Sequence, residues 1–205
     1  MLKLKNKKKG FTLVETMIAF LTLLLVTGAA LQIFKDSITS NNALSANLNS
    51  QGEIRNAFKS MSAGLRSASP SSLGAYPIAS AGTSSLIYYS DIDGDNLMEQ
   101  IRYFLSADIL KMGILKPSGN PLTYNQSNEI ITPLLNNIVN SSTPIFEYYN
   151  GSYDGDTESL AYPLTITNIR LIKITALINQ NPKIIPAIIM EFITQVSIRN
   201  LKDNL

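Results

Sequence analysis

Apolar residues fill almost every position from Phe11 to Phe34, directly after a polar leader that carries five lysines. The run contains no Pro, Lys, Arg or Asp. At about 1.5 Å per residue, a helix of this length crosses the roughly 30 Å hydrocarbon core of a bilayer. The pattern predicts a transmembrane helix over residues 11–34, and the lysines place its N-terminal side in the cytoplasm by the positive-inside rule.

A different helical pattern follows the apolar run. The apolar residues Ile54, Phe58, Met61 and Leu65 recur at the spacing of one helix face, and no proline occurs before Pro70. This periodicity predicts an amphipathic continuation of the helix over residues 35–67, with a polar stretch in its first part. We expect the stripe formed by Ile54, Phe58, Met61 and Leu65, the helix stripe below, to pack against a globular head.

The remaining residues, 68–205, predict a head rich in β-structure. Ser, Pro and Gly mark residues 66–85 as a loop, and a short helix is expected to start at Pro133. Two Asp-Gly pairs, at Asp93 and Asp154, predict hairpin turns. The predicted strands are Leu86–Ser90, Met98–Leu105, Ile109–Leu115, Ile145–Tyr149, Leu164–Ile178 and Ile188–Arg199. The fold class predicted is α+β, a long N-terminal helix packed against an antiparallel sheet.

Composition narrows the chemistry that the chain can perform. Cysteine, histidine and tryptophan are absent, which excludes disulfides, thiol chemistry, Cys or His metal sites and any His-based catalytic triad. The formal net charge is +2, but five of the 17 basic residues lie in the leader. Without the leader, 12 basic residues face 15 acidic ones, a charge of −3. Overall charge therefore gives no support to a nucleic-acid partner.

Glu15 is the one carboxylate within the apolar run. An ionised carboxylate near the centre of a membrane helix costs about 2.5–3.5 kcal/mol on insertion scales, and less close to the interface. Two interpretations account for it. The side chain reaches back to the lipid headgroups, or a partner supplies a cation on assembly.

At these residues the sequence resembles a known family. A basic leader, the Gly10–Phe11 junction and Glu15 ahead of an apolar helix together form the N-terminal signature of type IV pilins and the related pseudopilins. The resemblance implies that a prepilin peptidase removes residues 1–10 by cutting between Gly10 and Phe11, and then methylates the new amine of Phe11. It also implies that Glu15 pairs with the terminal amine of a neighbouring pilin or pseudopilin subunit.

The same resemblance implies a location and partners. The chain would be a single-pass protein of the cytoplasmic membrane, with its head outside, before a membrane assembly platform adds it to a surface or extracytoplasmic filament. Residues 196–202 also look like the ending of minor pilins that are similar to the J-type pseudopilins.

Three classes of function compete. The first is a structural subunit, a minor pilin or pseudopilin, of a type IV pilus, a type II secretion system or a competence filament. The second is a membrane-anchored binding module that such a filament presents, for example an adhesin or a receptor for DNA or a secreted substrate. The third, an enzyme, has no residue pattern behind it, and the N-terminal signature favours the first.

An acidic turn offers the head's candidate metal site. Asp91, Asp93 and Asp95 alternate along the chain and Glu99 follows, an oxygen-rich set that suits calcium. The set departs from an EF-hand, because Gly94 is fourth rather than sixth and the twelfth position is Arg102. Two interpretations stay open: a calcium site with these four carboxylates, or a solvated hairpin turn that needs no cofactor.

Overall fold

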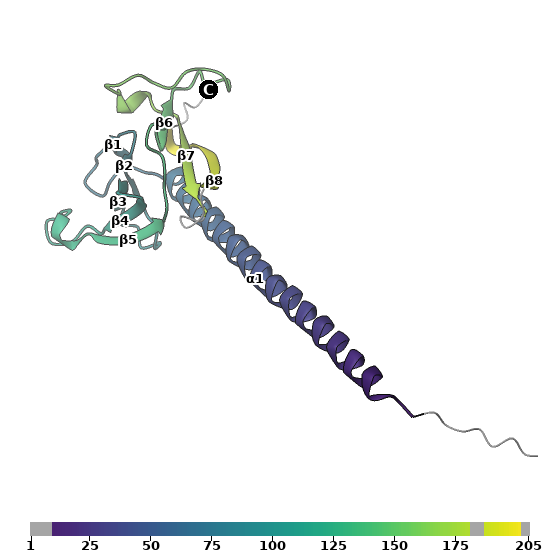
Figure 1. The fold of residues 1–205 in the computed structure, drawn as a ribbon. Helices are drawn as coiled ribbons and strands as arrows, with labels where there is room; N and C mark the ends of the chain where they lie inside the picture. The colour runs from purple at the N-terminus through teal and green to yellow at the C-terminus, as the bar shows by residue number, and fades with distance from the viewer. Residues whose placement is uncertain (1–9, 181–186, 202–205) are drawn as a thin grey trace, which may run out of the picture. The chain divides into compact units, whose positions relative to one another are not determined.

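The computed structural model describes residues 10–180 and 187–201, and of residues 39–50 it describes the backbone alone. The predicted leader therefore lies outside the described residues, apart from Gly10. The chain divides into two compact units, Met1–Asn49 and Ser50–Leu205. One helix, α1 (Leu13–Arg66), contributes residues to both (Figure 1).

The bounds of α1 agree with the sequence prediction to within two residues. The helix ends at Arg66, four residues before Pro70, and Ala68 closes the last turn by donating its N–H to the Leu65 carbonyl at 3.2 Å. A proline cannot donate the next helical hydrogen bond, so the chain leaves the helix ahead of it. The predicted helical continuation is confirmed.

The second unit combines the end of α1 with two antiparallel sheets, and the predicted α+β class is confirmed. The first sheet has the strand order β1-β2-β3-β4-β5 and the second has the order β6-β7-β8. The strands are β1 (Ile78–Ala81), β2 (Ser85–Ser90), β3 (Glu99–Ser106), β4 (Ile109–Leu115), β5 (Ile130–Leu135), β6 (Phe146–Tyr149), β7 (Leu171–Asn179) and β8 (Ile189–Ser197). Three short 3-10 turns complete the described elements: Gln126–Asn128, Ile166–Asn168 and Arg199–Leu201.

The helix stripe lies in the core of this unit, as predicted. Met61 and Leu65 are fully buried, and Ile54 and Phe58 are 7% exposed. They belong to one apolar cluster with residues from both sheets. Burying a side chain of this size contributes about 1.5–3 kcal/mol, so the stripe is a main source of the head's stability.

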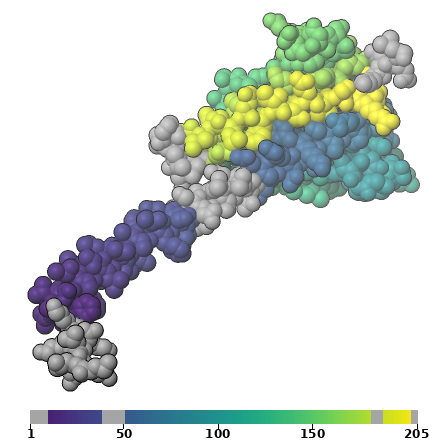
Figure 2. Space-filling view, turned by 90° about the vertical axis from the view of Figure 1, so that its right-hand side faces the viewer, coloured from purple at the N-terminus to yellow at the C-terminus, as the bar shows by residue number. Residues whose placement is uncertain are grey.

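Strand β8 lies along α1 within this unit. Figure 2 shows the yellow C-terminal segment beside the blue part of the helix. The rings of Phe58 and Phe192 are 6.1 Å apart, and the hydroxyls of Ser62 and Thr194 are 3.4 Å apart. The opposite flank of α1 faces the first sheet, where the Ser67 and Ser90 hydroxyls are hydrogen-bonded at 2.8 Å. Residues that are distant in sequence therefore hold the helix between two strands.

Three parts of the sequence prediction were wrong. Strand β1 lies within residues 66–85, which were predicted as a loop. The short helix expected from Pro133 is instead β5, an edge strand in which Pro133 stands opposite Lys111. Proline is tolerated at a sheet edge because its missing N–H has no further strand to bond. The strand predicted to start at Leu164 starts at Leu171, because the 3-10 turn Ile166–Asn168 precedes it.

We predict that Gly64→Ala destabilises the head although alanine is the better helix former. A Cβ at Gly64 would lie 2.5 Å from the Tyr88 hydroxyl, whose rigid ring is fully buried. Overpacking of this kind costs about 1–3 kcal/mol, more than the gain of up to about 1 kcal/mol in helix propensity. The measurement is unfolding of the full chain in detergent micelles, followed by tyrosine near-UV circular dichroism. All nine tyrosines lie between residues 76 and 162, so the signal reports the head alone.

Gly52→Ala is the matched control on the same helix. A Cβ at Gly52 meets no atom within 4 Å, so this variant should gain up to about 1 kcal/mol in the free energy of unfolding. Equal stabilities of the two variants would contradict the contact between Gly64 and Tyr88.

Candidate functional site

The first candidate site is the start of α1. Thr12 precedes the first helical residue, Leu13, and its hydroxyl oxygen accepts a hydrogen bond from the Glu15 N–H at 3.3 Å. In return, Glu15 Oε2 accepts hydrogen bonds from the Thr12 N–H and the Thr12 hydroxyl, each at 3.1 Å. This reciprocal arrangement is a capping box, which satisfies donors that a helix N-terminus otherwise leaves free.

The capping box gives Glu15 a partner that neither sequence interpretation included. The carboxylate lies at the positive end of the helix dipole and receives two hydrogen bonds from its own chain. The signal was present in the sequence, because Thr12-Leu13-Val14-Glu15 has the Ser/Thr-x-x-Glu spacing of a capping box. The cap therefore offsets part of the cost that an apolar environment would impose on this carboxylate.

The apolar half of α1 has the length and composition of a membrane span. Among the described residues, the helical segment Leu13–Ile38 meets that criterion, and none of it is buried by other parts of the chain. Large side chains on all of its sides are more than half exposed, including Phe20, Leu25 and Phe34. A helix that is apolar all round requires an apolar environment from outside the chain.

Gly10 and Phe11 lie just before the cap, outside the helix. A Cβ added at Gly10 would meet no atom within 4 Å, and Phe11 is 84% exposed. Nothing among the described residues explains a glycine or an aromatic ring at these positions. The Gly10 backbone and the Phe11 ring are therefore accessible to another molecule.

The second candidate site is the acidic turn in the β2–β3 connection, residues 91–98. Asp91 closes it by accepting hydrogen bonds from the N–H groups of Gly94 at 2.7 Å and Asn96 at 3.0 Å. Gly94 has a φ of 79°, a left-handed conformation that favours glycine. The Asp-Gly turn is thus found where the sequence predicted it, between two antiparallel strands.

The structure brings together three of the four predicted metal ligands. Ligand oxygens of Asp91, Asp93 and Glu99 all lie within 4.8 Å of one another. Asp95 lies outside this group and pairs with Lys116, which also reaches Asp93 Oδ2 at 2.7 Å. Lys116 could not be inferred from the sequence, because it follows β4 and reaches the turn only through the pairing of β3 with β4.

Two of these acids have altered pKa values. Burial raises the pKa of Glu99 above its ordinary value, while the hydrogen bond from the Ile92 N–H acts against the rise and the charge of Asp93 adds to it. The hydrogen bond from Lys116 lowers the pKa of Asp95. The turn therefore combines an exposed, lysine-paired carboxylate with a buried one that resists ionisation.

The second Asp-Gly turn is different in construction. Asp154 Oδ1 accepts hydrogen bonds from the Thr157 hydroxyl at 2.5 Å, the Thr157 N–H at 3.1 Å and the Asp156 N–H at 3.2 Å, and these bonds, the hydroxyl's above all, lower the pKa of Asp154. The turn lies in the long connection between β6 and β7. The Asp154 carboxylate is thus bonded within its own turn.

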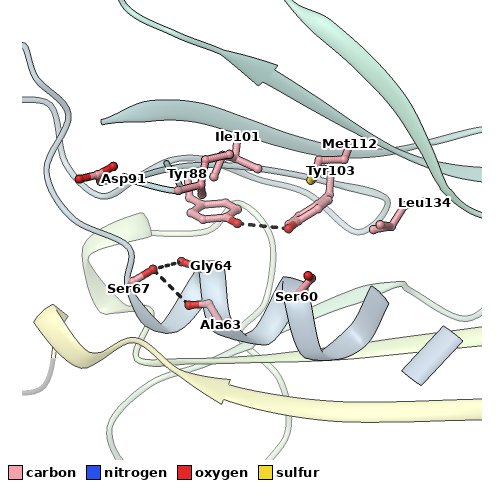
Figure 3. A pocket seen from close by; sticks show the side chains of 11 residues that line it. Ser60, Ala63, Gly64, Ser67, Tyr88, Asp91, Ile101, Tyr103, Met112 and Leu134 are labelled. Carbon is pink, nitrogen blue, oxygen red and sulfur yellow. Dashed lines mark hydrogen bonds between the residues drawn. The ribbon is translucent and has the colours of Figure 1, made fainter. Parts of the chain in front are cut away.

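The paired tyrosines of the head are structural. At most 7% of each residue is exposed in the pairs Tyr88–Tyr89 and Tyr148–Tyr149. None of these rings therefore has an accessible face on which a nucleic-acid base or a sugar could stack. The hydroxyls of Tyr88 and Tyr103 are 3.2 Å apart, and burial raises the pKa of Tyr88 well above its ordinary value. Figure 3 shows both rings reaching toward α1 at the wall of a cavity of about 390 Å3, with Asp91 at one end.

Comparison with known families agrees with the geometry at the start of α1. Residues 5–31 match the family model described as the prokaryotic N-terminal methylation motif. The motif indicates a type IV pilin-like protein that carries a prepilin signal, and it points to a structural rather than an enzymatic role. Such a signal implies processing by prepilin peptidase and assembly with other pilins. No curated protein matches the chain.

We predict that Thr12→Ala opens the first turn of α1. Loss of an N-cap hydroxyl costs about 1 kcal/mol, which corresponds to an approximately fivefold faster amide hydrogen exchange. The measurement is the exchange rate of the Glu15 N–H in detergent micelles. Thr12→Ser, which retains the hydroxyl, should exchange like the parent, and equal rates in Thr12→Ala and Thr12→Ser would contradict the capping box.

Proposed function

We propose that this chain is a minor pilin or pseudopilin, a structural subunit of a type IV pilus, type II secretion or competence filament. The observation that carries the proposal is the methylation motif over residues 5–31, which ends within the helical segment Leu13–Ile38, an apolar segment that no other described part of the chain buries. In this proposal, prepilin peptidase cuts between Gly10 and Phe11, and Phe11 becomes the methylated N-terminus. The lysine-rich side stays in the cytoplasm until that cut.

The exposed apolar half of α1 supports a role in two successive environments. Before assembly, lipid covers the segment Leu13–Ile38, as it covers any apolar helix of this length. In a filament, the same surface packs against the equivalent helices of neighbouring subunits. The apolar side chains are shielded from water in both environments, so the hydrophobic effect does not oppose transfer of the helix from lipid to filament.

In this proposal, the Glu15 carboxylate makes the filament more favourable than lipid for the helix. In the single chain its carboxylate bonds to Thr12 of the same helix, which offsets only part of the cost of a charge in lipid. In a filament, the amine of Phe11 on a neighbour would supply a full positive charge at short range in a water-poor site. The cap brings no full positive charge to the carboxylate, so the Coulomb attraction of an ion pair in a low-dielectric site is gained only in the filament, and this difference favours assembly.

The size of the head supports a minor rather than an abundant subunit. The unit Ser50–Leu205 carries two sheets and a long β6–β7 connection in addition to the end of α1. It also offers no described element with a catalytic arrangement. We therefore propose that the chain contributes a specialised head to a filament that other pilins build, with an assembly platform of the cytoplasmic membrane as its remaining partner.

We predict that Gly10→Val blocks processing and leaves the rest of the chain unchanged. A Cβ at this position meets nothing within the described structure, so the head should unfold like the parent. Co-expression with a prepilin peptidase and intact-mass measurement should give an uncut chain for the variant and a chain beginning at methylated Phe11 for the parent. An uncut parent, or a cut beyond Phe34, would overturn the assignment of the cleavage site.

We predict that Glu15→Gln and Glu15→Leu both reach the membrane at parental levels or above and both fail to assemble. Glutamine at the third helical position retains the capping box, whereas leucine removes it. If the negative charge is what assembly needs, the two variants should be lost equally from sheared filaments. The measurement is the ratio of sheared-filament to membrane fraction for each variant.

The pair of variants also separates the two roles of the side chain. Assembly of Glu15→Gln at the parental ratio would show that the cap, rather than the charge, is what the filament requires. Parental assembly of Glu15→Leu would contradict a role of this residue in the filament.

A further inference from the structure

A buried carboxylate oxygen beside the acidic turn has no partner among the described residues. It belongs to Glu99, which is the first residue of β3 and is only 2% exposed. Glu99 Oε2 accepts the Ile92 N–H at 3.0 Å, but the buried Oε1 has no hydrogen-bond partner in the part of the chain that the structure describes. A buried acceptor left in this state costs about 1–3 kcal/mol, and more if it is charged, so it requires an explanation.

The position of Glu99 supplies one. One of its carboxylate oxygens lies within 4.8 Å of oxygens from Asp91 and Asp93. Three carboxylates at this separation repel one another, and either a proton or a cation between them relieves the repulsion. Lys116 pairs with Asp93 and Asp95, and among the described residues it forms no ion pair with Asp91 or Glu99.

We infer that Asp91, Asp93 and Glu99 bind a calcium ion. All three offer carboxylate oxygens, which a hard cation prefers, and the backbone carbonyls and water of an exposed loop can complete six to eight ligands. Magnesium fits less well, because it demands a nearly ideal octahedron and releases its own water reluctantly. The Asp95 carboxylate, which the sequence had suggested as a ligand, is instead held by Lys116.

The loop is built to hold these oxygens in place. The Gly94 and Asn96 amides fix both oxygens of Asp91, and each of these oxygens keeps a lone pair for a metal. The Asp95 N–H bonds Asp93 Oδ1 at 3.3 Å. Arg102, at the twelfth position of the motif, is paired with Glu129 at 2.6 Å and points to a different partner. The site therefore uses a sheet residue, Glu99, where an EF-hand uses its twelfth residue.

The test is thermal unfolding of the full chain in detergent micelles, followed by tyrosine near-UV circular dichroism, in chelator, calcium or magnesium. Calcium at about 1 mM should raise the midpoint by roughly 5 °C through preferential binding to the folded head. Magnesium at the same concentration should leave the midpoint unchanged. No shift with calcium, or an equal shift with magnesium, would overturn the assignment.

The variant Glu99→Gln distinguishes a metal ligand from a residue with only a structural role, because the two roles predict opposite changes of the unfolding midpoint in chelator. Glutamine keeps an acceptor for the Ile92 N–H and removes the unpaired charge, so the variant should melt at or above the parent in chelator. It should also lose the calcium shift. Retention of the shift, or a lower midpoint in chelator, would contradict a metal-binding role.

Two further variants complete the test. Asp93→Asn should weaken calcium binding at least tenfold in isothermal titration, because one charged ligand is lost. Asp156→Asn changes the other Asp-Gly turn, whose carboxylate lies outside the cluster, and should bind calcium like the parent. Parental binding by Asp93→Asn, or equal weakening by Asp156→Asn, would overturn the site.

Discussion

The structure depends on a single helix that must satisfy two different environments along its length. Over Leu13–Ile38 the helix is largely apolar, and no other described residue buries it. From Ile54 to Leu65 it is apolar on one face, which both sheets of the head cover. The head therefore has no complete core without the end of α1, and the first half of α1 has no stable surroundings without lipid or other subunits.

Glu15 links the apolar half of α1 to the proposed assembly of a filament. A charge in an apolar helix is a cost that a static membrane anchor has no reason to keep. The capping box with Thr12 lowers that cost in the single chain, since it provides two hydrogen bonds and the helix dipole. The cap supplies no cation, so the carboxylate still carries an unpaired charge. In the proposed filament, the amine of a neighbouring subunit pairs with that charge. In the proposed function, the cap and the intermolecular pair are successive states of one carboxylate.

Much of the fold could be predicted from local patterns, and the failures have specific physical reasons. The helix stripe was predictable because its spacing repeats over three turns, and β2 and β4 were predictable from short runs rich in Ile, Leu and Tyr. Strand β5 was missed because proline at a strand edge is allowed by tertiary context that the sequence does not display. The short strand β1 was missed because Ser and Gly around it are typical of a loop.

The candidate sites likewise contain features that local sequence patterns predict and features that depend on tertiary contacts. The residues of the N-terminal motif are contiguous, so the sequence was sufficient to find them, although the capping role of Thr12 was overlooked. For the acidic turn, the four carboxylates could be identified from the sequence, but which of them lie close together could not be predicted. Which of them converge depends on the burial of Glu99 and on the reach of Lys116 from β4, and both follow from strand pairing.

We propose that Glu15 leaves its own cap and pairs with the N-terminal amine of a neighbour in the filament. Carbodiimide coupling can detect this pair, because the reagent joins a carboxylate to an amine only when they are in contact. In sheared filaments, we expect a cross-linked peptide that joins Glu15 to the N-terminal residue of another subunit, identified by mass spectrometry after mixed isotope labelling. A filament that contains this chain and yields Glu15 only in uncoupled form, while other contacts in it are cross-linked, would rule the pair out.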